Sequence, residues 1–129
     1  MAETASHNLG PIRVMHVLRA PLGGLFRHVL DLSHEQSRRG HEVGLIVDAT
    51  TYGEAADRLL ADLSPKLSLG LSRVSMRRDP HLTDFSALVH VLSRLKVTRP
   101  HVVHGHGSKG GAFARLPGFL PGGGSEILY

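Results

Sequence analysis

Two short glycine-rich segments hold the residues of this sequence whose types and spacing are best suited to binding a ligand. The first, residues 19–24 (RAPLGG), places Gly23 and Gly24 at the entrance of a predicted helix. Because glycine has no Cβ atom, the backbone there can come close to a ligand, and the free N–H groups and dipole of a helix start favour an anion such as phosphate. The segment has neither the G-x-G-x-x-G spacing of dinucleotide-binding proteins nor the G-K-[ST] of a P-loop. A tight strand-to-helix turn without a ligand explains it as well.

The second segment, residues 104–111 (HGHGSKGG), carries His104 and His106 at the end of a predicted strand. Residues two apart on a strand point to the same face of the sheet. An imidazole at this edge can donate a hydrogen bond to a hydroxyl or a phosphate oxygen, or it can simply fill a crevice. Zinc usually takes three or four ligands, and no cysteine or spaced carboxylate cluster supplies the rest, so we expect no metal site.

Short apolar runs alternate with longer helical patterns, and these elements must position the two segments. Strands are predicted over residues 12–18, 42–48, 72–76, 101–104 and 126–129, and helices over 25–39, 51–63, 79–99 and 109–116. Such alternation implies parallel pairing, because each crossover returns to the same edge of the sheet. The predicted fold class is α/β, with a doubly wound, mostly parallel, Rossmann-like sheet. Ligands bind such sheets beyond the carboxyl ends of the strands, so the two segments should open side by side there.

The sequence also predicts where helices begin and end, and which face they bury. Gly40 should end the helix over residues 25–39. Thr51 and Glu54 have the spacing of a capping box at the start of the helix over 51–63. The helix over 79–99 carries an apolar stripe formed by Leu82, Phe85, Leu88, Val89, Leu92 and Leu95.

Length and composition narrow the class of protein. The 129 residues fit one domain, and the absence of cysteine excludes a disulfide framework. No apolar stretch approaches the ~20 residues that span a bilayer. Residues 1–11 are polar and lack the apolar core of a signal peptide, so we expect this segment to be disordered and residues 12–129 to form a domain in the cytoplasm.

The net charge of +4 and the pI of about 10.1 suit a surface that attracts phosphates, nucleic acid or an anionic membrane. The basic residues are spread along the chain, so they also fit ordinary solvated helix faces. Aromatic residues make up only 5% of the sequence, and base stacking needs them, so we expect no nucleic-acid partner.

An ordered set of motifs links the two glycine-rich segments. It consists of Gly23-Gly24, His28-Val29, residues 39–43 (RGHEV) and residues 100–107 (PHVVHGHG). Over residues 12–116 this set resembles the N-terminal domain of glycosyltransferase family four, the GT-B enzymes formerly called group 1 glycosyltransferases.

The resemblance implies a retaining hexosyl-type transferase that moves a sugar from a nucleotide sugar to a saccharide or lipid-linked acceptor, with no cofactor and no metal ion. It implies that Gly23 and Gly24 reach the donor diphosphate and sugar, and that His106 is the catalytic-site histidine beside the donor sugar. Ser108 and Lys109 would line the acceptor side. Many bacterial relatives build polysaccharide or lipopolysaccharide at the inner face of the plasma membrane, which implies peripheral membrane association.

The family's paired-glutamate motif and most of its donor site belong to a second, C-terminal domain. The sequence ends inside a predicted strand, so we expect it to be the N-terminal, acceptor-side part of a longer enzyme, truncated and inactive alone. An unpaired strand edge invites pairing with another copy, so this part should dimerise or aggregate.

A small flavodoxin-like module that binds a nucleotide or regulates a partner is the main alternative. It explains the α/β pattern and the glycine-rich segments equally well. A receiver, however, needs clustered acidic residues after the first strand, where this sequence has Arg19-Ala20-Pro21.

Overall fold

Strands and helices alternate along the chain, as the sequence predicts. The computed structural model describes residues 10–19, 23–49, 53–75, 83–107 and 126–128. In chain order the elements are β1 (Arg13–Leu18), α1 (Gly23–Arg38), β2 (Glu42–Asp48), α2 (Glu54–Leu63), the 3-10 turn η1 (Ser64–Lys66), β3 (Gly70–Val74), α3 (Thr83–Thr98), β4 (Val102–His106) and β5 (Glu126–Leu128). The predicted disordered start (residues 1–9 of it) and the predicted helix over 109–116 lie outside the described residues.

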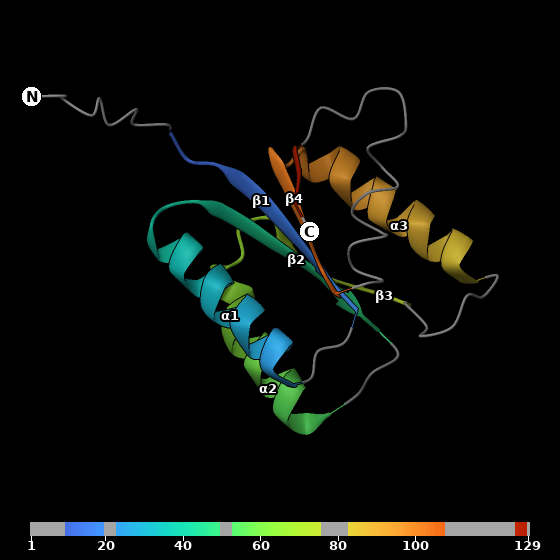
Figure 1. Cartoon of the computed structure of the whole chain (residues 1–129), viewed down its shortest axis with the longest axis horizontal. Coiled ribbons are helices and arrows are strands. Elements are labelled where there is room, and N and C mark those ends of the chain that lie inside the picture. Colours follow the sequence, from blue (N-terminus) through green and yellow to red (C-terminus); the bar gives the residue numbers. More distant parts are fainter. Residues whose placement is uncertain (1–9, 20–22, 50–52, 76–82, 108–125, 129) are drawn as a thin grey trace, which may run out of the picture.

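The five strands form one parallel sheet in the order β3-β2-β1-β4-β5 (Figure 1). The chain builds outward from β1 to β2 and β3, and then returns to the other side of β1 with β4 and β5. The order therefore reverses between β1 and β4, which makes the gap beyond their carboxyl ends the switch point of the sheet. This is the Rossmann order, so the predicted α/β fold is confirmed. The flavodoxin-like alternative, which places β1 between β2 and β3, is wrong.

Helices cover both faces of the sheet, with α1 and α2 on one side and α3 on the other (Figure 1). Alternate residues of β2 show why: Leu45 packs in the core beneath α1 and α2, and Ile46 packs in the core beneath α3. Both side chains are fully buried. A strand that is buried on both faces has no side that meets water, and this explains why the sequence of β2 is continuously apolar.

The end of α1 is fixed by a left-handed glycine. Gly40 has a φ of 89°, its N–H bonds the carbonyl of Ser37, and the N–H of His41 bonds the carbonyl of Gln36. This pair of bonds is the Schellman arrangement, in which glycine avoids the steric penalty of a Cβ atom. The predicted stop at Gly40 is confirmed.

Three predicted elements have boundaries that differ slightly from those of the structure. α2 has Gly53 as its N-cap and no side-chain cap, so Glu54 is the first helical residue and not the third residue of a capping box. Thr51, the other half of the predicted box, lies outside the described residues. β3 begins and ends two residues earlier than predicted. β4 runs two residues further, to His106, because its pairing with β1 continues as far as Leu18.

The buried face of α3 also differs from the predicted stripe. Ala87 and Val91, one turn apart, are buried against the sheet, whereas Phe85 and Val89 are 75% and 49% exposed. Ala87 and Val91 belong to the core cluster on this face of the sheet, and the partly buried Leu88 and Leu95 pack against it. Among the described residues, no helix is both long and apolar enough to cross a membrane.

Gly44 in β2 should tolerate no side chain. A Cβ atom there would lie 2.6 Å from Met15 Cε and 2.8 Å from Leu69 Cβ, inside normal contact distance. We expect Gly44→Ala to lower the free energy of unfolding by about 1–3 kcal/mol, as overpacked cores do. Urea denaturation would measure the loss. Gly24→Ala is the matched control, because a Cβ atom at Gly24 meets no atom within 4 Å; equal destabilisation of both variants would contradict the steric explanation.

Candidate functional site

The two glycine-rich segments meet at one rim of the sheet. β1 and β4 are neighbours, and their last residues, Leu18 and His106, are partners in the parallel register. A Cβ atom at Gly107 would lie 3.5 Å from Leu25 Cδ2, so the end of β4 touches the first turn of α1. The prediction that the twin glycines and the histidine pair open side by side at the carboxyl edge is confirmed.

Gly23 and Gly24 are the first two residues of α1, and both are exposed. Gly23 has a φ of 75°, a conformation that L-residues with a side chain rarely adopt. The first turn of α1 has no acidic side chain, and a Cβ atom at either glycine would have open space around it among the described residues outside its own helix turn. The helix start is therefore open to an anion on its solvent side, with nothing in the first turn to repel it.

His106 lies at the same rim, but its ring is directed into the protein. It is 6% exposed and belongs to a cluster with His16 and His104. The ring centroids of His104 and His106 are 3.9 Å apart, and those of His16 and His106 are 5.1 Å apart. His28 of α1 approaches from above the sheet, 6.4 Å from His106 between ring centroids.

Strand geometry explains the histidine cluster. His104 and His106 share a face because they are two apart on β4, and His16 is the register partner of His104 on β1. That face is the one covered by α1. His16 was not predicted as a site residue. Its only signal in the sequence is that a polar residue interrupts an apolar strand. The register of β1 with β4 explains this interruption, because it places His16 beside His104.

A chain of hydrogen bonds fixes the protonation pattern of the cluster. His16 Nε2 lies 2.7 Å from Gln36 Oε1, and His16 Nδ1 lies 2.9 Å from His106 Nε2. An amide oxygen only accepts hydrogen bonds, so His16 Nε2 carries the proton and His16 Nδ1 has the free lone pair. His106 therefore donates through Nε2–H, and its own Nδ1 becomes an acceptor. Gln36, on α1, sets the tautomer of His16 directly and that of His106 through His16.

Comparison with known proteins identifies the family. The model of Glycosyltransferase Family 4 matches residues 22–124, which include the start of α1, all of β4 and the segment after it. This chain belongs to glycosyltransferase family 4. A search of curated protein sequences gave no significant match.

Two solved structures share the fold of this family 4 domain. MurG from Acinetobacter baumannii superposes with a TM-score of 0.62 at 21% identity, over 84% of this chain and 33% of that one. A glycosyltransferase from Rickettsia africae superposes with a TM-score of 0.65 at 11% identity, over 91% of this chain and 28% of that one. The family 4 chain thus spans about a third of the length of these two proteins.

The structure describes only some of the residues predicted for the site. Ser108 and Lys109, expected on the acceptor side, lie outside the described residues. Gly23, Gly24 and His106 come together at the rim, as the family resemblance implies.

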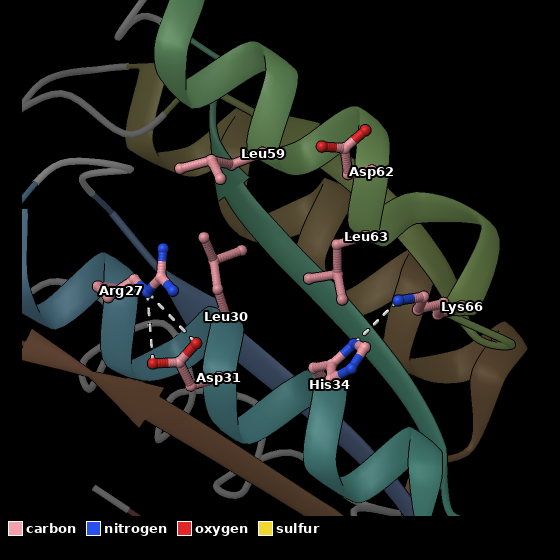
Figure 2. A pocket seen from close by; sticks show the side chains of 8 residues that line it. All are labelled: Arg27, Leu30, Asp31, His34, Leu59, Asp62, Leu63 and Lys66. Atoms are coloured by element: carbon pink, nitrogen blue, oxygen red, sulfur yellow. Dashed lines mark hydrogen bonds and ion pairs between the residues drawn. The ribbon is translucent and has the colours of Figure 1, made fainter.

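The family 4 domain also has a small hollow that contains none of the predicted site residues. It lies between α1 and α2, has a volume of about 160 Å³, and is lined by Arg27, Leu30, Asp31, His34, Leu59, Asp62, Leu63 and Lys66 (Figure 2). Arg27 pairs with Asp31 at 3.3 Å, and Lys66 Nζ lies 3.1 Å from His34 Nδ1. Because it contains no residue of the rim, we assign no substrate to it.

One group among the described residues has the composition of a metal site. His16, His104 and His106 each offer one ring nitrogen, and these three atoms lie within 4.8 Å of one another. The sequence-based expectation of no metal counted only the two histidines of one segment. The fold adds a third from β1.

Burial keeps the clustered imidazoles uncharged. Burial, together with the neighbouring histidines, lowers the pKa of His16 to about 4 and that of His106 to about 3. Burial also lowers the pKa of His104. At neutral pH all three rings are therefore neutral. They can form hydrogen bonds at the edge of the anion site without placing a charge there.

Acidification should destabilise the domain through His16 and His106. In the unfolded chain each imidazole takes up a proton near pH 6.5, whereas the folded pKa values are about 4 and about 3. Between pH 6.5 and 4 the unfolded state binds more protons, so the free energy of unfolding falls as the pH falls. We expect a loss of about 2 kcal/mol between about pH 7 and about pH 5.5, measured by urea denaturation with EDTA present.

His104 adds to this effect, because burial lowers its pKa as well. His28 of α1 faces the same cluster. His106→Gln should reduce the pH dependence, whereas His90→Gln, at an exposed position on α3, should not alter it. Equal stability of the unsubstituted protein at both pH values would contradict the prediction.

Proposed function

We propose that this chain is the acceptor-side domain of a retaining, nucleotide-sugar-dependent glycosyltransferase that transfers a hexosyl group to a saccharide or lipid-linked acceptor. Family membership supports the transferase class. The observation that carries the proposal is the shared rim, where the exposed start of α1 and the last residue of β4 meet at the switch point of the sheet. Open α/β sheets bind their ligands beyond the carboxyl ends of the strands, at such a switch point.

The rim suits the leaving group of such a reaction. A departing nucleoside diphosphate develops negative charge as the bond to the sugar breaks. The N–H groups at Gly23 and Gly24 and the positive end of the α1 dipole are preorganised donors for that charge. In the proposed reaction they stabilise the transition state, with no metal ion and no other cofactor.

His106 is the proposed catalytic residue, beside the donor sugar. Its Nε2–H is occupied by His16, so its Nδ1 is left to accept a hydrogen bond from a sugar hydroxyl. Because the His106 ring is neutral, it brings no negative charge that would compete with the diphosphate for the N–H donors of the rim. Ser108 and Lys109 are proposed to line the acceptor side.

A second Rossmann-like domain, beyond the 129 residues, is proposed to hold most of the donor. The coverage of 33% and 28% of the two solved neighbours supports this, because it leaves room in such proteins for a further domain. We also propose a role in bacterial polysaccharide or lipopolysaccharide synthesis at the cytoplasmic face of the plasma membrane. The formal charge of +4 fits peripheral association with an anionic surface.

Gly24→Ala in the full-length protein separates function from stability. Gly24 is exposed and a Cβ atom there has open space among the residues that the structure describes, so the melting temperature should stay the same or rise slightly. If the donor diphosphate sits at this helix start, the added methyl group should lower kcat/KM at least ~10-fold, which is about 1.4 kcal/mol of transition-state stabilisation. The assay measures nucleoside diphosphate release over a panel of nucleotide sugars, with product anomers identified by NMR.

Gly10→Ala is the control, because Gly10 is also exposed with open space around it but lies at the opposite end of β1. Unchanged kcat/KM in Gly24→Ala would show that the donor diphosphate does not bind at this helix start. Release of nucleoside diphosphate from none of the sugars would reject the proposed function altogether, and inversion at the anomeric carbon would reject the retaining mechanism.

The 129-residue polypeptide alone should turn over no nucleotide sugar at ordinary enzyme rates, since the proposed second domain supplies most of the donor site. Among the described strands β5 lies at an edge of the sheet, so we expect concentration-dependent association. A coupled assay and analytical ultracentrifugation would test both points. Turnover comparable to that of the full-length protein would reject the two-domain requirement, and a monomer at all concentrations would reject edge pairing.

A further inference from the structure

The histidine cluster has more imidazoles than a single sugar contact needs. His16 is fully buried and His106 nearly so, while His104 is half-buried on the same strand. One ring nitrogen from each lies within 4.8 Å of the others. We propose that His16, His104 and His106 form a three-histidine site for a zinc ion at the junction of β1 and β4.

The donor set fits this ion. Imidazole nitrogen is a preferred zinc ligand, and three histidines with a water in the fourth position make a common four-coordinate site. The ring of His104 makes no hydrogen bond to another described residue, so both of its nitrogens are open on the described side. Its partial exposure gives the ion a path of entry and room for a water molecule.

Gln36 supplies the outer contact that such sites require. A metal-binding histidine almost always donates its second ring N–H to an oxygen, which fixes the ring and raises its basicity. His16 already does so, with Nε2 at 2.7 Å from Gln36 Oε1. The lone pair of His16 Nδ1 is thereby directed at the centre of the cluster, toward His106.

Only a small rearrangement separates the observed cluster from a tetrahedral site. With Zn–N bonds of about 2.0–2.1 Å, two ligand nitrogens stand about 3.3 Å apart. His16 Nδ1 and His106 Nε2 are 2.9 Å apart, so this pair opens by a few tenths of an ångström. The His106 ring stays neutral, because its proton moves from Nε2 to Nδ1 when Nε2 binds the ion, and Nδ1–H would then donate to a sugar hydroxyl instead of accepting from it. His104, the most exposed of the three, closes on the ion by a rotation of its side chain.

The proposed ion has a structural consequence. It would join β1 to β4 at the point where the strand order reverses, and through Gln36 it would join both strands to α1. Zinc would thus hold together the three elements that form the rim. The transfer reaction proposed above uses no metal, and zinc binding is tested without any sugar donor, so the two proposals can fail separately.

The test is zinc binding by the full-length protein, prepared without a histidine tag and stripped with a chelator. Isothermal titration with Zn²⁺ should show one site that is lost or weakened at least ~100-fold in His104→Ala, since even outer-shell substitutions cost 10–100-fold. His104 is half-buried, so this variant should fold. His90→Ala, which removes an exposed histidine on α3, is the matched control and should bind as the unsubstituted protein does.

Co²⁺ gives a second measurement that reports the ligands. The unsubstituted protein should show the visible absorption of four-coordinate cobalt with nitrogen ligands, and His104→Ala should not. At zinc concentrations about 100-fold above Kd, the melting temperature should rise by roughly 5–10 °C in the unsubstituted protein and remain unchanged in His104→Ala.

Substitution of Gln36 tests the geometry. Gln36→Ala should weaken zinc binding about 10–100-fold, whereas Gln36→Glu, which retains an acceptor oxygen for His16 Nε2–H, should preserve or strengthen it. The proposal is overturned if His104→Ala binds Zn²⁺ as tightly as the His90→Ala control, or if the unsubstituted protein binds no zinc. Equal weakening by Gln36→Ala and Gln36→Glu would overturn the assigned role of Gln36.

Discussion

The parallel pairing of β1 with β4 is the contact on which the arrangement of this domain depends. β1 is the first strand of the chain and the centre of the sheet, and β4 reaches it only after two other strand–helix units have been laid down on the opposite side. Their register matches Leu18 with His106, so both strands end at the same level. Because strands in a parallel sheet all point the same way, this one match places the start of α1 and the end of β4 at a common rim.

The same pairing gives the rim an outer and an inner part. Outside, Gly23 and Gly24 present backbone to open space at the positive end of a helix. Inside, the alternation of side chains along β1 and β4 stacks three imidazoles beneath α1. His106 belongs to both parts, since it ends the strand at the rim while its ring lies in the cluster.

Burying these imidazoles opposes folding, because each polar ring must replace its contacts with water. The cost is limited by the chain of hydrogen bonds from Gln36 through His16 to His106, and by keeping the rings uncharged. An apolar residue at position 16 would pack beneath α1 without this cost. Polar groups that break the apolar pattern of a central strand are a common mark of a functional site, because stability alone does not favour them.

The fold class, several element boundaries and the family could be predicted from the sequence, because the patterns that indicate them are local. The apolar runs and helical periodicities follow from the burial of each element, and they were sufficient for the α/β class, the bounds of β2 and the stop at Gly40. The motifs around Gly23, Gly24 and His106 were also sufficient for the family, which the match over residues 22–124 bears out.

The tertiary structure decided what depends on packing between distant segments. The face of α3 that is buried is the one where Ala87 and Val91 join the core cluster of the sheet, and the extension of β4 to His106 follows from its ladder with β1. His16 joins the other histidines only through that ladder, across a separation of 90 residues. Periodicity along a chain says which residues share one face of an element; which elements lie side by side, and in what register, is set only when the whole sheet buries its apolar surface at once.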